Sequence, residues 1–166
     1  GLTQACFDTF AGETGKKIFR RPIHPAERAQ LLTEMDGYTD LIIQDERGRI
    51  LEATTSNVFI VRQGVLATPR ATDQILEGIT RDTLVVIARN LGIRCVERPV
   101  DRTELYDCRE AFLCSTGLEI LPIASVDRLT VGDGAAGPIT DALRRQYRSI
   151  VRGAAPLHGD WLTAVY

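Results

Sequence analysis

The sequence contains few metal-binding side chains, little excess charge and no long apolar run. Its 166 residues include two histidines and four cysteines, and because no C-x-x-C pair occurs, a metal site is not expected. The 20 basic residues are balanced by 22 acidic ones, whereas a nucleic-acid-binding protein usually has a basic excess. The longest unbroken apolar run, residues 84–88, is far shorter than a membrane span.

The beginning of the chain also lacks the charged-then-apolar pattern of a secretory signal. We therefore expect a cytoplasmic protein with four reduced thiols, while the even cysteine count also permits disulfides. Neither nucleic acid nor a membrane is expected as a partner.

What the sequence does contain is typical of one globular domain, or of two very small ones. Hydrophobic residues make up 44% of the chain and charged residues 25%, both close to the averages of globular proteins. The apolar segments are mostly short and are separated by turn residues. This pattern predicts a mixed α/β fold with short strands.

The predicted elements follow the apolar periodicity. Strands are expected at residues 41–43, 50–61, 65–67, 93–98, 111–114 and 119–126. Helices are expected at residues 25–35, about 80–90, 101–107 and about 139–151. Residues 1–24 are expected to be irregular, and residues 131–138 to form glycine-rich turns.

The helix at residues 80–90 has the clearest pattern. Thr80 is the predicted N-cap, and Gly92 follows the helix where a left-handed residue is often required. The apolar stripe at helical spacing consists of Leu84, Ile87, Ala88 and Leu91. One face of this helix is therefore expected to pack against the core.

Glu52 begins a run of small and polar residues, 52–57, inside an otherwise apolar strand pair. One interpretation is a solvated edge strand or a bulge. The other is a carboxylate directed at a cationic ring nitrogen, with small neighbours that leave room for a flat ligand. The residues alone leave both interpretations open.

Two further segments have the character of anion sites. Residues 76–81 lie at the start of the clearest helix, where unpaired N–H groups favour phosphate; Gly78 would let the backbone come close, and Thr80 adds a hydroxyl. Residues 115–117, Ser-Thr-Gly, follow a predicted strand and offer two hydroxyls and a flexible backbone. An ordinary helix start and an ordinary turn are the alternatives.

Together these segments resemble the C-terminal large domain of class IV, fold-type IV pyridoxal-phosphate enzymes. That family includes branched-chain and D-amino-acid aminotransferases, with aminodeoxychorismate lyase as a relative. The resemblance extends over residues 41–166 and follows an ordered series of motifs at residues 51–59, 78–81, 96–99, 111–113, 116, 121–123, 132–134 with 137–138, and 160–163.

The resemblance implies a fold of short strands in a pseudo-barrel-like sheet with packed helices. Residues 38–166 would form the fold-type IV C-terminal domain. Residues 1–37 would be an irregular segment, a remnant or part of the family's N-terminal domain.

The resemblance also implies the role of each site residue. Contacts to pyridoxal 5'-phosphate would come from Glu52 at the ring nitrogen, Leu76 on the ring face, and Ile79, Thr80 and Thr116 at the phosphate. The substrate carboxylate would lie near Ser115, Gly117 and Leu118. Asn57 is expected to brace the glutamate strand rather than to touch the substrate.

The family's catalytic lysine carries the cofactor and moves a proton. Counting back from Glu52 by the family's spacing reaches Ile18, so Lys17 is the candidate and Lys16 the alternative. The asparagine and aromatic residue that normally follow this lysine are missing. A solvated basic face, or the first strands of the N-terminal domain, are other interpretations of this cluster.

The function implied is a pyridoxal-phosphate-dependent aminotransferase of amino acid metabolism, or a truncated form of one. It would transfer an amino group between an amino acid and a 2-oxo acid as a homodimer. The alternative is a reduced fold-type IV domain without the lysine, acting as a cofactor-independent enzyme or as a binding or assembly module.

Overall fold

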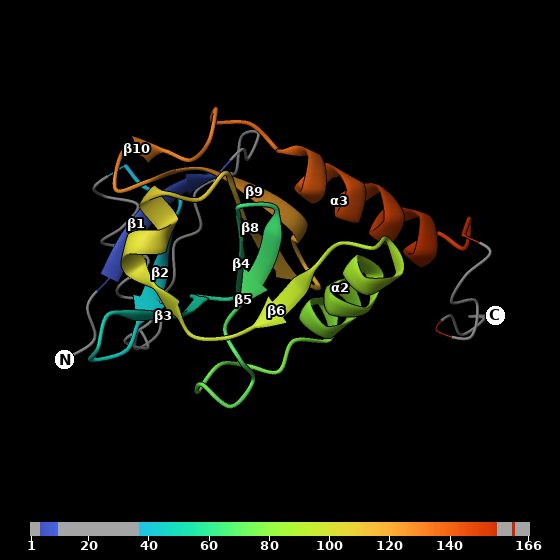
Figure 1. The fold of residues 1–166 in the computed structure, drawn as a ribbon, viewed down its shortest axis with the longest axis horizontal. Coiled ribbons are helices and arrows are strands. Elements are labelled where there is room, and N and C mark those ends of the chain that lie inside the picture. Colours follow the sequence, from blue (N-terminus) through green and yellow to red (C-terminus); the bar gives the residue numbers. More distant parts are fainter. Residues whose placement is uncertain (1–3, 10–36, 156–160, 162–166) are drawn as a thin grey trace, which may run out of the picture.

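The computed structural model describes residues 4–9, 37–155 and 161. Within these residues the strands are β1 (Gln4–Thr9), β2 (Asp40–Gln44), β3 (Arg49–Ala53), β4 (Asn57–Arg62), β5 (Val65–Thr68), β6 (Cys95–Glu97), β7 (Val100–Asp101), β8 (Glu110–Ser115), β9 (Glu119–Val126) and β10 (Leu129–Thr130). They form one ten-stranded sheet in the order β6-β5-β4-β8-β9-β1-β2-β3-β7, with β10 added beside β9 (Figure 1). Neighbouring strands are antiparallel, except that β5 and β6 are parallel.

The sheet curls so far that its two ends are joined by only two residues. β6 and β7 stand at opposite ends of the strand order, yet Glu97 ends the first and Val100 begins the second. Arg98, in this short link, donates hydrogen bonds to both carboxylate oxygens of Glu104 at 2.7 and 2.6 Å. The predicted mixed α/β fold with a pseudo-barrel-like sheet is therefore confirmed.

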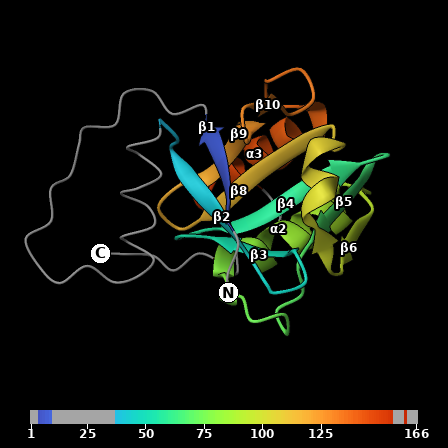
Figure 2. The same cartoon turned by 90° about the vertical axis from the view of Figure 1, so that its left-hand side faces the viewer.

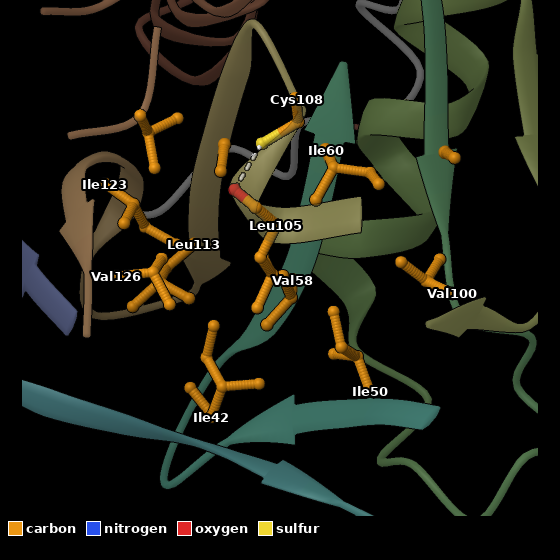
Figure 3. Close-up of a cluster of buried hydrophobic side chains, with 14 residues drawn as sticks. Ile42, Ile50, Val58, Ile60, Val100, Leu105, Cys108, Leu113, Ile123 and Val126 are labelled. Carbon is orange, nitrogen blue, oxygen red and sulfur yellow. Dashed lines mark hydrogen bonds between the residues drawn. The ribbon is translucent and has the colours of Figure 1, made fainter. Parts of the chain in front are cut away.

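Strand alternation gives the curled sheet two apolar cores. In β4, Val58 and Ile60 belong to the core inside the curl (Figure 3). Their neighbours Phe59 and Val61 point to the opposite face and belong to a second core. Phe59 lies opposite Phe112 of β8, with the two rings stacked at 5.0 Å between centroids.

Two helices cover the outer core. α2 (Ile79–Asn90) and α3 (Pro138–Val151) pack side by side against the outer face of the sheet, where both contact β8 (Figures 1 and 2). Leu84 and Ile87 of α2 and Leu143 of α3 are buried there. A 3-10 helix, η1 (Arg102–Tyr106), follows β7. None of the helices in the described part of the chain is long and apolar enough to cross a membrane.

The predicted strand at residues 50–61 is wrong as a continuous element. β3 pairs with β2 and β7, whereas β4 pairs with β5 and β8. Residues 54–56 cross between these two halves of the sheet. The crossing is held by hydrogen bonds from Thr54 Oγ1 to Asp40 and from the Ala53 N–H to the Ser56 carbonyl. Small polar residues suit this crossing because their backbone leaves the ladder.

Three other expectations differ from the structure. Thr80 is not the N-cap of α2, because Gly78 occupies that position. Leu91 lies just beyond the helix and is 42% exposed, so the buried stripe is shorter than predicted. The expected irregularity of residues 1–24, and of the whole segment 1–37, is wrong for Gln4–Thr9, since β1 pairs with β2 and β9. The predicted helix at 25–35 lies outside the described residues.

Candidate functional site

A pocket of about 670 Å³ forms where three chain segments meet. Its sides are residues 52–57, which include the β3–β4 crossing, the start of α2 at residues 76–80 and the β8–β9 turn at residues 114–118. The volume lies within the range of small-molecule sites. The structure brings the predicted residues of the C-terminal domain together in this lining: Glu52, Leu76, Ile79, Thr80, Ser115, Thr116, Gly117 and Leu118.

Glu52 supplies a carboxylate to the first side of the pocket. It lies in β3, and its Oε2 accepts a hydrogen bond from the Leu76 N–H at 2.9 Å. Among the described residues of the lining, the other charged side chain is Glu77, which is also acidic. The charged side chains described here therefore suit a cationic group, such as a protonated ring nitrogen, beside Glu52.

The N-terminus of α2 forms the second side. The first N–H groups of a helix lack intrahelical partners and carry the positive end of its dipole. At α3 these groups are satisfied internally, because the Glu110 carboxylate accepts hydrogen bonds from the N–H groups of Ile139 and Thr140 at 3.1 and 2.7 Å. At α2 the N-cap is Gly78, which has no side chain to serve as a cap. The first turn of α2 is therefore suited to an external anion.

The turn between β8 and β9 forms the third side. Ser115 Oγ accepts a hydrogen bond from the Leu118 N–H at 3.2 Å, which holds the turn closed. Thr116 and Gly117 are exposed at its tip. Glu119 ends the turn with a φ of 57°, and its carboxylate accepts a hydrogen bond from Arg148 of α3 at 2.9 Å. This ion pair connects the turn to α3.

Cys114 is a lining residue that sequence reasoning missed. Burial raises the pKa of its thiol to about 12, so the thiol is not a nucleophile near neutral pH. Its place in the lining follows from strand register, because Cys114 pairs with Asn57 and directly precedes Ser115. The signal that identifies Cys114 as a lining residue is therefore the register of β4 and β8, which is known only once these strands have been paired.

Known proteins are similar to this chain over most of its length. The family described as "Amino-transferase class IV" matches residues 10–126. The chain belongs to the class IV aminotransferases. Over 133 residues it is 38% identical to a probable branched-chain-amino-acid aminotransferase of Aquifex aeolicus, a match that covers 80% of this chain and 43% of that protein.

Solved structures of branched-chain aminotransferases share the fold. The branched-chain amino acid aminotransferase of Thermobaculum terrenum in its PLP form superposes with a TM-score of 0.80 at 47% identity, over 83% of this chain and 45% of that one. The branched-chain aminotransferase of Thermoproteus uzoniensis with norvaline gives a TM-score of 0.81 at 41% identity, over 85% and 46%. The chain thus spans less than half the length of these relatives.

The candidate lysines of this class IV chain, Lys17 and Lys16, lie outside the described residues. They are the only lysines in the sequence. No group of histidine, cysteine, aspartate and glutamate side chains that could hold a metal ion occurs in the part of the chain that is described.

Proposed function

We propose that this chain is the cofactor-binding part of a pyridoxal-phosphate-dependent aminotransferase, of the branched-chain or D-amino-acid type. The observation that carries the proposal is one pocket with the Glu52 carboxylate on one side and the glycine-capped start of α2 on another. The names of the relatives support the reaction, a transfer of an amino group between an amino acid and a 2-oxo acid.

The donor set of the pocket fits pyridoxal 5'-phosphate. The Glu52 carboxylate would accept a hydrogen bond from the protonated ring nitrogen. Leu76, which is 71% exposed in the same pocket, offers apolar surface to a face of the ring. The backbone N–H groups of Ile79 and Thr80, together with the hydroxyls of Thr80 and Thr116, would bind the phosphate. When bound, the cofactor supplies an electron sink for the substrate.

The remaining roles fall to the third side of the pocket and to the N-terminal lysines. Ser115, Gly117 and Leu118 would lie near the substrate carboxylate. Lys17, or Lys16 in its place, would carry the cofactor and move the proton at the substrate α-carbon.

We also propose that the chain acts as a cytoplasmic homodimer. Three apolar side chains of the pocket lining are exposed: Leu76 at 71%, Ile79 at 81% and Leu118 at 41%. Exposed apolar groups gathered around a pocket favour coverage by another protein surface, and a second copy of this chain is the occupant we propose. Cys95, Cys108 and Cys114 are all free thiols, which suits a reducing compartment.

Covalent labelling tests the catalytic part of the proposal. The protein is mixed with pyridoxal 5'-phosphate, reduced with borohydride and digested for peptide mapping. The expected result is a yellow protein whose spectrum changes with an amino acid, and an adduct on Lys17 or Lys16. A colourless protein that takes up no cofactor would contradict the proposal and support the cofactor-independent module.

A binding experiment tests the pocket independently of the lysines. Pyridoxamine 5'-phosphate binds without a covalent bond, and Glu52→Gln should weaken its binding about tenfold because the charge opposite the ring nitrogen is lost. Glu46→Gln, in the β2–β3 turn, is the matched control and should leave the affinity unchanged. Equal affinities for the Glu52→Gln variant and the unmodified chain would refute the role of Glu52.

A further inference from the structure

Asn57 connects the three sides of the pocket. It is the first residue of β4, and its backbone pairs with Cys114, the residue before the β8–β9 turn. Its side chain is directed to the segment before α2, where Nδ2 donates a hydrogen bond to the Leu76 carbonyl at 2.9 Å. Only 5% of Asn57 is exposed, so little of it can touch a ligand.

Leu76 is bound from both sides by the β3–β4 crossing. The Leu76 N–H donates a hydrogen bond to Glu52 Oε2 at 2.9 Å, and the Leu76 carbonyl accepts a hydrogen bond from Asn57 Nδ2, also at 2.9 Å. Glu52, in β3, and Asn57, in β4, lie on either side of the crossing. The segment that leads into α2 therefore cannot shift relative to Glu52 without breaking one of these hydrogen bonds.

Gly78 contacts the same asparagine. Its backbone angles, φ −77° and ψ 125°, are open to any residue, so conformation does not require glycine here. A β-carbon at this position would overlap Asn57 Oδ1. The close approach of Asn57 is thus a reason for glycine at this position that is separate from the approach of an anion expected from the sequence.

We propose that Asn57 is a positioning residue that fixes the separation between the Glu52 carboxylate and the first N–H groups of α2. A ligand that engages both ends then binds a preformed site and does not have to order residues 76–78 itself. The inference rests on the proposed function, in which the ring nitrogen and the phosphate of one cofactor engage these two ends.

The first test compares a ligand that engages both ends with one that engages a single end. Asn57→Ala should weaken the binding of pyridoxamine 5'-phosphate about tenfold, because its two ends no longer face groups at a fixed separation. Inorganic phosphate, measured by competition, should lose less than about twofold, because it needs only the start of α2. Asn90→Ala, at the far end of α2, is the matched control. Equal losses for both ligands, or no loss for either, would overturn the inference.

The second test needs no cofactor and measures the contact itself by urea unfolding. Gly78→Ala should lower the unfolding midpoint in the unmodified chain, because the new methyl group meets Asn57. In an Asn57→Ala background the same change should lower the midpoint by less than half as much. Additive effects would overturn the proposed contact. If the unmodified chain bound no pyridoxamine 5'-phosphate, the proposed function would fail, and this cycle would still decide whether Asn57 contacts Gly78 at the start of α2.

Discussion

Two glutamates show how surroundings direct the same side chain to different uses. Glu110 is 5% exposed, and both of its oxygens accept hydrogen bonds from the first turn of α3. Glu52 is half-buried in the pocket, where one of its oxygens accepts a hydrogen bond from the Leu76 N–H. Glu110 therefore stabilises the fold, whereas Glu52 keeps capacity for a ligand.

Gly137→Ala should destabilise the protein through Glu110. A β-carbon at residue 137 would overlap the Glu110 side chain, which must then move away from α3. We expect a loss of about 1–3 kcal/mol in the free energy of unfolding, measured by urea denaturation. Gly117→Ala is the control for stability, because its β-carbon would meet open space. Equal effects of the two substitutions would contradict this account.

The buried thiols should react slowly while the protein is folded. Burial raises the pKa of Cys108 and of Cys114 to about 12, and that of Cys95 to about 11, from a reference of 9.0. The protonated form therefore persists to higher pH than in the unfolded chain. At pH 8 we expect iodoacetamide to alkylate Cys108 and Cys114 at least about a hundredfold more slowly than in urea.

The alkylation of these buried thiols should become faster as the pH rises. In the folded protein, the rates at Cys108 and Cys114 should rise about tenfold for each pH unit between pH 8 and pH 10, because the thiolate fraction rises by that factor. Peptide mass mapping resolves each cysteine. Equal rates in the folded and unfolded protein would show that these thiols are not shielded.

At the scale of elements, α2 depends on one buried arginine. Arg81 is 1% exposed, and its guanidinium donates hydrogen bonds to the Pro69 carbonyl at 2.8 Å and to Glu97 of β6 at 2.5 Å. These bonds join the first turn of the helix to the ends of β5 and β6. The orientation of the first N–H groups of α2 toward the pocket therefore depends on this connection.

Arg81→Ala should lower the free energy of unfolding by about 2–4 kcal/mol. The change removes a buried cation and leaves the Pro69 carbonyl and Glu97 without this donor. Arg89→Ala, an exposed change in the last turn of the same helix, is the matched control and should cost less than about 1 kcal/mol. Urea denaturation measures both. Similar losses would show that Arg81 does not anchor the helix.

At the scale of the whole molecule, the pocket lies where the chain passes between the two halves of the curled sheet. β3 belongs to one half and β4 to the other, and the residues that cross between them line the pocket. The exposed apolar residues of the lining lie at the same place. The curling of the sheet thus forms the pocket and also places an exposed apolar surface beside it, where a second copy of the chain could bind.

The oligomeric state tests the use of that surface. Light scattering of the whole chain should give a mass near twice 18.3 kDa. Ile79→Lys should shift the population toward the monomer, because it places a charge on the apolar surface while keeping the backbone N–H. Leu129→Lys, at an exposed site on β10 outside the pocket lining, is the control. A monomer in the unmodified chain would contradict the proposed homodimer.

Local signals in the sequence were sufficient for most of the described elements. The predicted strand at 119–126 coincides with β9, and the helix predicted from about residue 80 to 90 differs from α2 by one residue at its start. Gln63 and Gly64, which join β4 to β5, both have positive φ, as a type I′ hairpin turn requires. These features depend on residues close together in the chain, which is why periodicity and turn chemistry predict them.

The remaining features depend on residues that are distant in the chain. The crossing at residues 54–56 follows from the pairing of β3 and β4 with different strands. The N-cap of α2 is Gly78, and Asn57, 21 residues earlier in the chain, lies where a β-carbon at residue 78 would point. No pattern within either segment contains this information.

The sequence by itself determined the kind of fold, the family and the eight residues of the described chain that were proposed for the site. It could do so because alternation, helix starts and family motifs are local. Only the tertiary structure decided that these residues share one pocket, and that Asn57, at the start of β4, contacts Leu76 and Gly78. The physical reason is the curl of the sheet, which brings residues 52, 76 and 115 together across segments that local chemistry cannot relate.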